Sequence, residues 1–99
     1  MANKLDITYS NQAVLRADQI IKYLLENWSE KEVKNFLTAL EGFEEIVTRF
    51  PEIYPQSMTL KGFRRAVIAK QVSVIYSIHK GEIRVYTLFD NRQNPKSLK

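Results

Sequence analysis

A chain of 99 residues is long enough for one domain with a buried core and too short for two, so a single domain over residues 1–99 is expected. The absence of cysteine excludes disulfides and thiolate metal sites, and one histidine among scattered carboxylates gives no metal-ligand spacing. We therefore expect neither a metal nor a cofactor. No apolar run approaches the ~18 residues of a membrane span, and the first ten residues lack the apolar middle of a signal peptide, which predicts a cytoplasmic protein without membrane contact.

The net charge of +4 is divided unevenly along the chain. Residues 1–50 carry six Lys/Arg and eight Asp/Glu, a net charge of −2, whereas residues 51–99 carry nine against three, a net charge of +6. Such a division indicates an anionic partner for the basic half, either nucleic acid or an acidic protein. The alternative is that the basic strands are simply solvated.

The first half of the chain reads as a strand followed by two helices. Residues 5–9 (LDITY) alternate apolar and polar side chains, which is typical of a half-buried strand. Apolar residues then recur every three or four positions over 13–28, which predicts a helix with one apolar stripe. A second helix begins after Ser29, which can form a capping box with Glu32, and it ends at Pro51. Because only a few residues connect the helices, we expect an antiparallel hairpin.

The second half reads as a loop and three strands. Residues 51–62 contain two prolines and a glycine, and the predicted strands cover 63–70, 72–79 and 82–90. Lys80-Gly81 is a two-residue hairpin turn, because glycine supplies the positive φ that such turns need. The sequence therefore predicts an α+β domain in which the helix hairpin packs on a small antiparallel sheet, with the first strand at one edge or between its neighbours.

The predicted turn fixes a register in which Ser77 pairs with Arg84, and strand alternation then divides the side chains between two faces. The face expected to cover the helices holds Val72, Val74, Tyr76, Ile78, Ile83, Val85, Thr87 and Phe89. The open face is expected to hold Ser73, Ile75, Ser77, His79, Arg84, Tyr86 and Leu88.

A tight turn between the first two of these strands places Arg64 beside Ser77, so that the row Arg64–Ser77–Arg84 crosses three strands next to Tyr86. Two guanidinium groups around a small hydroxyl, with no carboxylate between them, would bind an anion. A slip of one residue would put Arg65 in place of Arg64. The alternative to a cluster is that each arginine pairs with a loop carboxylate or points into water.

The residue types limit the chemistry. The sequence offers no nucleophile triad, no paired carboxylates in the basic half and no phosphate-binding glycine spacing. Cleavage of RNA by its own 2′-hydroxyl remains possible, because it needs only cations and one group that moves protons. The candidate catalytic residues are Arg64, Arg84 and Arg92 for charge and His79 for proton transfer. A lone histidine at a strand end is more often a spectator, and Tyr86 suits a stacked base or a partner's helix equally well.

The chain ends in TLFDNRQNPKSLK, in which an apolar strand runs directly into a polar segment. We expect Phe89 to anchor this segment in the core and Pro95 to end any further strand pairing. Arg92 would then lie at the rim of the open face, near Arg84.

The order of these features resembles the RelE/ParE superfamily of toxins from type II toxin–antitoxin systems. The resemblance covers almost the whole chain and rests on the segments ENWSEKEVKNFLTAL, FPEIYP, KGFRRAVIAKQVSVIYSI and LFDNRQNP. It implies a small toxin that inhibits growth and is neutralised by a cognate antitoxin. The target would be either DNA gyrase, which ParE-like members inhibit without being nucleases, or mRNA in the ribosome, which RelE-like members cut. The residues expected to contact the target or the antitoxin are Arg65, Tyr86, Asp90, Asn91 and Asn94.

Two positions depart from the family patterns. RNA-cleaving members commonly keep a cation where this chain has Ser73, and ParE-like members often have a histidine where this chain has Asp90. The closing arginine is retained as Arg92, and the closing motif is most similar to ParE-like and plasmid-stabilisation members. The resemblance therefore favours a gyrase inhibitor over a ribonuclease, and a non-toxic RNA- or protein-binding module is a third possibility.

Overall fold

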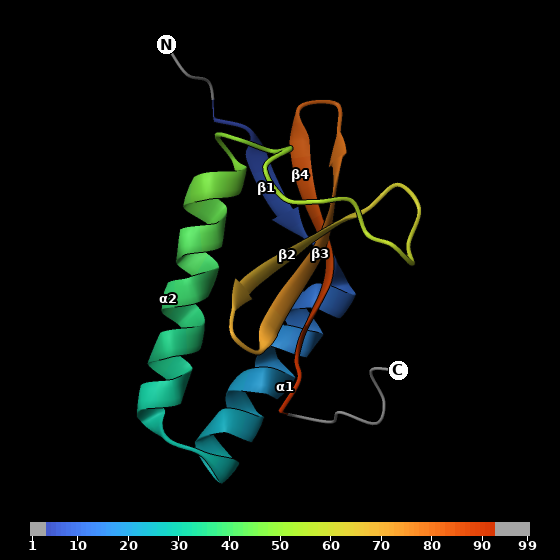
Figure 1. The fold of residues 1–99 in the computed structure, drawn as a ribbon. Coiled ribbons are helices and arrows are strands. Elements are labelled where there is room, and N and C mark those ends of the chain that lie inside the picture. The colour runs from blue at the N-terminus through green and yellow to red at the C-terminus, as the bar shows by residue number, and fades with distance from the viewer. Residues whose placement is uncertain (1–3, 93–99) are drawn as a thin grey trace.

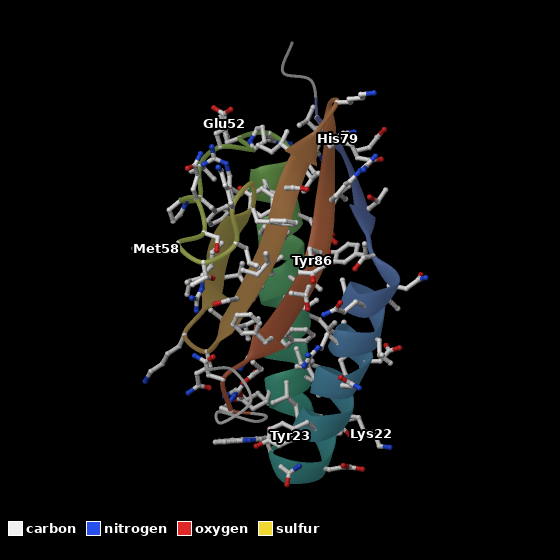
Figure 2. The ribbon with its side chains drawn as sticks, turned by 90° about the vertical axis from the view of Figure 1, so that its right-hand side faces the viewer. Lys22, Tyr23, Glu52, Met58, His79 and Tyr86 are labelled. Atoms are coloured by element: carbon white, nitrogen blue, oxygen red, sulfur yellow. The ribbon has the colours of Figure 1, made fainter. Side chains whose placement is uncertain are left out.

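The computed structural model describes residues 4–92, which form two helices and a sheet of four strands. In chain order the elements are β1 (Asp6–Tyr9), α1 (Asn11–Asn27), α2 (Glu30–Val47), β2 (Arg64–Ala69), β3 (Val72–His79) and β4 (Glu82–Asp90). The helix hairpin packs against one face of the sheet (Figure 1), and Figure 2 looks onto the other face, with α2 behind the strands and α1 beside the lower part of β4. This arrangement confirms the predicted α+β domain.

The strand order is β1-β4-β3-β2, which puts the first strand at an edge, one of the two positions expected. β1 lies parallel to β4, whereas β2, β3 and β4 pair antiparallel, so one pairing departs from the wholly antiparallel sheet that was expected. The difference follows from the path of the chain. After the helices the chain enters the sheet at the far edge, and three antiparallel strands then bring β4 beside β1 in the same direction.

Both helices begin at a serine cap. The Ser10 hydroxyl accepts a hydrogen bond from the amide of Ala13 at 3.0 Å, and the Ser29 hydroxyl accepts one from the amide of Glu32 at 3.3 Å. The capping box predicted for the second helix is only half formed, because the Glu32 carboxylate accepts from Arg92 instead. Within residues 4–92, neither helix is long and apolar enough to cross a membrane.

An aromatic cluster joins α2, the following loop and β3. The ring centroids of Phe43, Tyr54 and Tyr76 lie between 5.6 and 6.2 Å apart, within the range of favourable edge contacts. Burial raises the pKa of Tyr76 to about 12, so its hydroxyl stays protonated and donates to the Pro51 carbonyl at 2.6 Å. Buried aliphatic side chains complete the core: Ile20, Leu24, Val47, Ala66, Val72, Val74, Ile83, Val85 and Leu88.

A β-bulge interrupts β4 in its middle. From Glu82 to Val85 this strand pairs with β3 in the predicted register. The pairing then shifts, because Ile75 pairs with Thr87 and Tyr86 is left as an extra residue. One extra residue moves every later side chain of the strand to the opposite face of the sheet.

The bulge corrects the predicted end of the strand. Leu88 is fully buried in the core, whereas Phe89 is only partly buried and lies outside the core cluster. The predictions that Phe89 anchors the core and that Leu88 lies on the open face are therefore wrong. Ile78, also assigned to the core face, is 36% exposed near the hairpin turn.

The bulge makes the relative cost of two substitutions a test of the register. Leu88→Ala is expected to lower the free energy of unfolding by about 2–5 kcal/mol, because it leaves a cavity in the core. Phe89→Ala removes more atoms but should cost less, because its ring is on the open side of the sheet. Urea denaturation of both variants measures the two losses in free energy of unfolding. A larger loss for Phe89→Ala would contradict the bulge, because it would mean that Phe89 and not Leu88 is the core residue.

Candidate functional site

The open face is the side of the sheet that the helices leave uncovered (Figure 2). The register assigns to it Arg65, Val67, Ser73, Ile75, Ser77, His79, Arg84, Tyr86, Thr87 and Phe89, so Thr87, expected on the core face, is also moved by the bulge. Figure 2 shows Tyr86 near the middle of this face and His79 at its hairpin end. Among residues 4–92, no group of three or more acidic or histidine side chains is placed to hold a metal ion.

Arg64 is on the helix side of the sheet and not on the open face. It pairs with Tyr76 and not with Ser77, because β2 has a register shift between Val67 and Ala69. Its Nη1 donates to the carbonyl of Tyr54 at 2.7 Å, which holds the loop after α2 against the sheet. The predicted row of Arg64, Ser77 and Arg84 is therefore wrong.

Arg65 lies on the open face in place of Arg64. Its Nε and Nη2 donate to the Ser73 hydroxyl at 3.4 and 3.3 Å, and its guanidinium carbon lies 5.6 Å from the centre of the Phe89 ring. In the part of the chain that the structure describes, none of the ion pairs involves Arg65. The guanidinium is thus held in position while its charge is not neutralised by a carboxylate.

Arg84 lies nearer the hairpin end of the same face. Its Nε donates to the Glu82 carboxylate at 2.8 Å, and its side chain is 55% exposed. The two terminal nitrogens of Arg84 make no hydrogen bond within residues 4–92. His79, which pairs with Glu82 across the turn, is exposed at the strand end.

An aromatic pair borders a groove beside Arg84. The rings of Phe63 and Tyr86 have centroids 5.2 Å apart, and they line one part of a groove of about 290 Å³. Thr8 and Ser77 add hydroxyl groups to its lining. Phe63 was not among the predicted site residues. It is the first residue of the strand predicted over 63–70, and the register expected for that strand put its neighbour Arg64 on the open face; in the structure β2 begins at Arg64.

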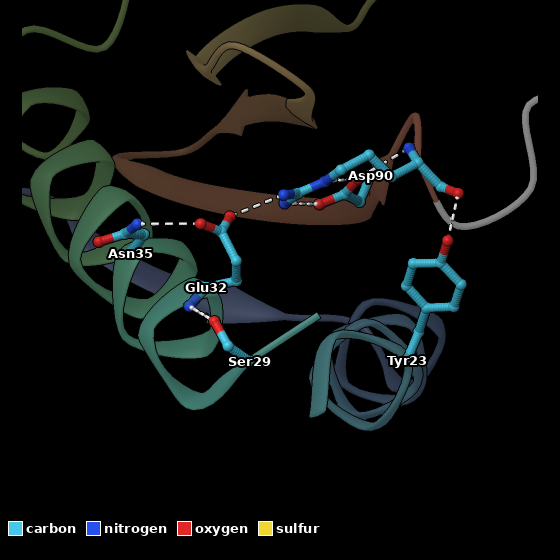
Figure 3. A network of polar contacts seen from close by, with 6 residues as sticks. Tyr23, Ser29, Glu32, Asn35 and Asp90 are labelled. Atoms are coloured by element: carbon cyan, nitrogen blue, oxygen red, sulfur yellow. Dashed lines mark hydrogen bonds and ion pairs between the residues drawn. The ribbon is translucent and has the colours of Figure 1, made fainter. Parts of the chain in front are cut away.

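Arg92 is bound by two carboxylates at the other end of β4 (Figure 3). Its Nε and Nη2 donate to the two oxygens of Asp90 at 3.0 and 2.7 Å, and its backbone amide donates to the same carboxylate at 2.8 Å. Its Nη1 donates to Glu32 at 2.7 Å. The Asp90 side chain has no exposed surface, and that of Arg92 is 16% exposed. Hydrogen bonding to Asp90 outweighs the effect of burial and, together with Glu32, raises the pKa of Arg92.

Two further contacts attach Arg92 to the helix hairpin. Its guanidinium carbon lies 5.1 Å from the centre of a Trp28 ring, and its carbonyl accepts from the Tyr23 hydroxyl at 2.7 Å (Figure 3). We call these five residues the C-terminal clasp: Tyr23, Trp28, Glu32, Asp90 and Arg92. The clasp connects the end of β4 to both helices, and two carboxylates neutralise the charge of its one arginine.

The predicted position of Arg92 near Arg84 is wrong. The bulge points Asp90 toward the helices, and Arg92 follows its carboxylate to that side. Nothing in the sequence relates Arg92 to a glutamate sixty residues earlier. The Asp-x-Arg spacing was visible, but Asp90 was assigned to binding and not to holding the arginine.

The structure does not bring the candidate catalytic residues together. The eight residue steps from Glu82 to Asp90 in β4, at ~3.3 Å each, separate the two residues by about 26 Å along the strand. His79 and Arg84 lie toward one end of this distance and Arg92 at the other, so one phosphate cannot contact all three. The backbone N–H of Asn91 donates to the Gln71 carbonyl at 2.8 Å, while Asn94 lies outside the described residues.

The clasp predicts unequal effects for two arginine substitutions. Arg92→Ala should lower the free energy of unfolding by about 3–5 kcal/mol, because it leaves the buried Asp90 carboxylate without its partner. Arg84→Ala breaks an exposed ion pair and should cost only about 0–1 kcal/mol. Chemical denaturation of both variants, of Asp90→Ala and of the Asp90→Ala/Arg92→Ala double mutant also measures the coupling between Asp90 and Arg92. Equal losses in free energy of unfolding for Arg92→Ala and Arg84→Ala would contradict the clasp.

Comparison with known proteins identifies the fold. No protein-family model matches the sequence, and no curated protein matches it either. The structure is similar to a chain of the chromosomal ParDE TA system from P. aeruginosa, with a TM-score of 0.68 at 14% identity over 88% of this chain and 96% of that one. It is also similar to the E. coli DinJ-YafQ toxin-antitoxin complex, with a TM-score of 0.58 at 17% identity over 90% and 94%.

A third similar structure is the YoeB dimer from Staphylococcus aureus, with a TM-score of 0.54 at 21% identity over 85% of this chain and 93% of that chain. These structures share the helix hairpin and the sheet with the present one over nearly their whole length. The chain therefore has the fold of the RelE/ParE superfamily of toxins.

Proposed function

We propose that this chain is the toxin of a type II toxin–antitoxin module and that it acts in the cytoplasm by binding an essential target such as DNA gyrase. A cognate antitoxin would neutralise it. The observation that carries the choice of a binding mechanism is the C-terminal clasp, in which Asp90 and Glu32 occupy the closing arginine. The fold, and the toxin–antitoxin complexes among the similar structures, support the module.

The arrangement of cations supports binding over RNA cleavage. Stabilisation of a phosphorane requires charges that converge on one phosphate. Arg64 faces the helix side, Arg92 is neutralised in the clasp, and His79 lies at the far end of the sheet. What the open face does offer is an exposed mixture of guanidinium and aromatic groups, which is typical of surfaces that bind proteins.

One observation favours the alternative, a RelE-like ribosome-dependent mRNA endoribonuclease. Arg65 brings its guanidinium to the Ser73 hydroxyl, the position at which the resemblance places a cation in RNA-cleaving members. Arg65 would then supply that charge from the neighbouring strand. This mechanism would also require Arg92 to leave Asp90 and Glu32 when the ribosome binds.

Expression of the chain without an antitoxin, from an inducible promoter in a bacterial host, is expected to arrest growth. The purified chain should inhibit DNA supercoiling by gyrase, because the proposed toxin acts on that target. Primer-extension mapping of cellular mRNA should show no codon-phased cuts. Arg65→Ala is expected to weaken both growth arrest and gyrase inhibition without lowering the melting temperature, since Arg65 is exposed.

Lys22→Ala provides the matched control, because it removes a positive charge from an exposed position on α1 (Figure 2). Codon-phased cuts that disappear in Arg65→Ala would establish the ribonuclease in place of the gyrase inhibitor. A harmless protein at high expression would contradict both mechanisms and leave a non-toxic binding module.

A further inference from the structure

The groove beside the Phe63–Tyr86 pair combines apolar walls with a charged end. Its volume of about 290 Å³ lies at the lower limit of ligand pockets and suits one large side chain. Tyr86 is 41% exposed, so part of its ring is available to a partner. The groove thus provides a place for an apolar group directly beside a cation.

Arg84 lines the same groove and has hydrogen-bonding capacity to spare. Only its Nε is engaged, by Glu82, so the two terminal nitrogens can bind one carboxylate in bidentate geometry. The hydroxyls of Thr8 and Ser77 lie along the groove and can bind the backbone of an extended segment.

Arg65 supplies a second cation on the same face. It pairs with Ile75, whereas Arg84 pairs with Ser77, two residues further along β3. Two strand spacings of ~4.8 Å and two residues of ~3.3 Å put the two arginine Cα atoms about 12 Å apart. An extended peptide covers about 13 Å in four residues, so acidic residues at positions i and i+4 match the two arginines.

We propose that this groove is the docking site for an acidic, extended polypeptide segment that carries one aromatic or large aliphatic side chain between two carboxylates. The apolar side chain packs in the groove against the Phe63–Tyr86 pair, and the carboxylates pair with Arg84 and Arg65. We assign this segment to the antitoxin, an assignment that rests on the proposed function.

Charge and polarity favour a protein segment over nucleic acid. Nucleic acids bind through many phosphate contacts, and this part of the face presents two guanidiniums, one of them beside Glu82. Glu82 and Asp6, paired across β1 and β4, would repel a phosphate chain that continued past Arg84. A short acidic peptide with an apolar anchor avoids this region and still uses both arginines.

The test uses a fluorescein-labelled peptide, Gly-Glu-Ala-Phe-Ala-Glu-Gly, and fluorescence anisotropy with the purified full chain. We expect saturable binding that weakens with added salt. Replacement of the peptide Phe by Ala should weaken binding by about tenfold, because the anchor side chain dominates such interfaces. Replacement of both peptide glutamates by glutamine should weaken it several-fold.

The matching substitutions in the protein are Tyr86→Ala and Arg84→Gln, each expected to weaken binding by about threefold or more. Arg84→Gln changes an exposed side chain and keeps the assay informative if Tyr86→Ala lowers stability. Lys22→Gln removes a charge from α1 and should bind the peptide like the unaltered chain. Unchanged affinity in both groove variants would overturn the proposal.

A competition experiment tests whether nucleic acid, and not a peptide, is the preferred ligand of the groove. A decauridylate RNA that displaces the peptide at lower concentration than the unlabelled peptide does would overturn the proposal in favour of nucleic acid. The result is independent of toxicity. Peptide binding by a chain that does not arrest growth supports the groove while the proposed function fails, and growth arrest without peptide binding overturns the groove alone.

Discussion

The β-bulge at Tyr86 determines what each side of the sheet can do. Ile75 pairs with Thr87 and not with the residue that uninterrupted pairing would give, so the side chains after the bulge exchange faces. Leu88 enters the core and Phe89 moves under Arg65 on the open face. Asp90 then points at the helices, where its buried carboxylate requires a cation. The C-terminal clasp and the place of Phe89 on the open face are thus two consequences of one extra residue.

The separation of charges between the two sides has a functional meaning. On the helix side, the charge of Arg92 is matched by Asp90 and Glu32, and this arginine holds the chain end in place. On the open face, Arg65 forms none of the ion pairs within residues 4–92, and Arg84 is paired through one of its three nitrogens. The positive charge that remains available to a partner is therefore beside Phe63, Tyr86 and Phe89. A surface of this kind is better suited to binding than to phosphoryl chemistry.

Local patterns predicted most of the fold, and non-local pairing determined the rest. Apolar spacing and the Ser29 cap predicted the helix hairpin, and the glycine turn predicted the pair Ser77–Arg84, because each involves neighbours in sequence. The two strand irregularities carry no comparable marker, since neither contains a glycine or proline. Each shifts the register by one residue, which exchanged Arg64 with Arg65 and Leu88 with Phe89 between faces. The clasp joins residues sixty positions apart, so only the folded chain reveals it.

The central claim is that Arg92 is held by the clasp and unavailable to a substrate. Hydrogen exchange of arginine Nε–H groups, measured by NMR on the intact chain, tests it directly. The clasp predicts that the Nε–H of Arg92 exchanges far more slowly than that of Arg84, because its bond to the buried Asp90 is shielded from water while the Arg84 side chain is exposed. Equal exchange rates for the two groups would contradict the account and return Arg92 to the candidate catalytic residues.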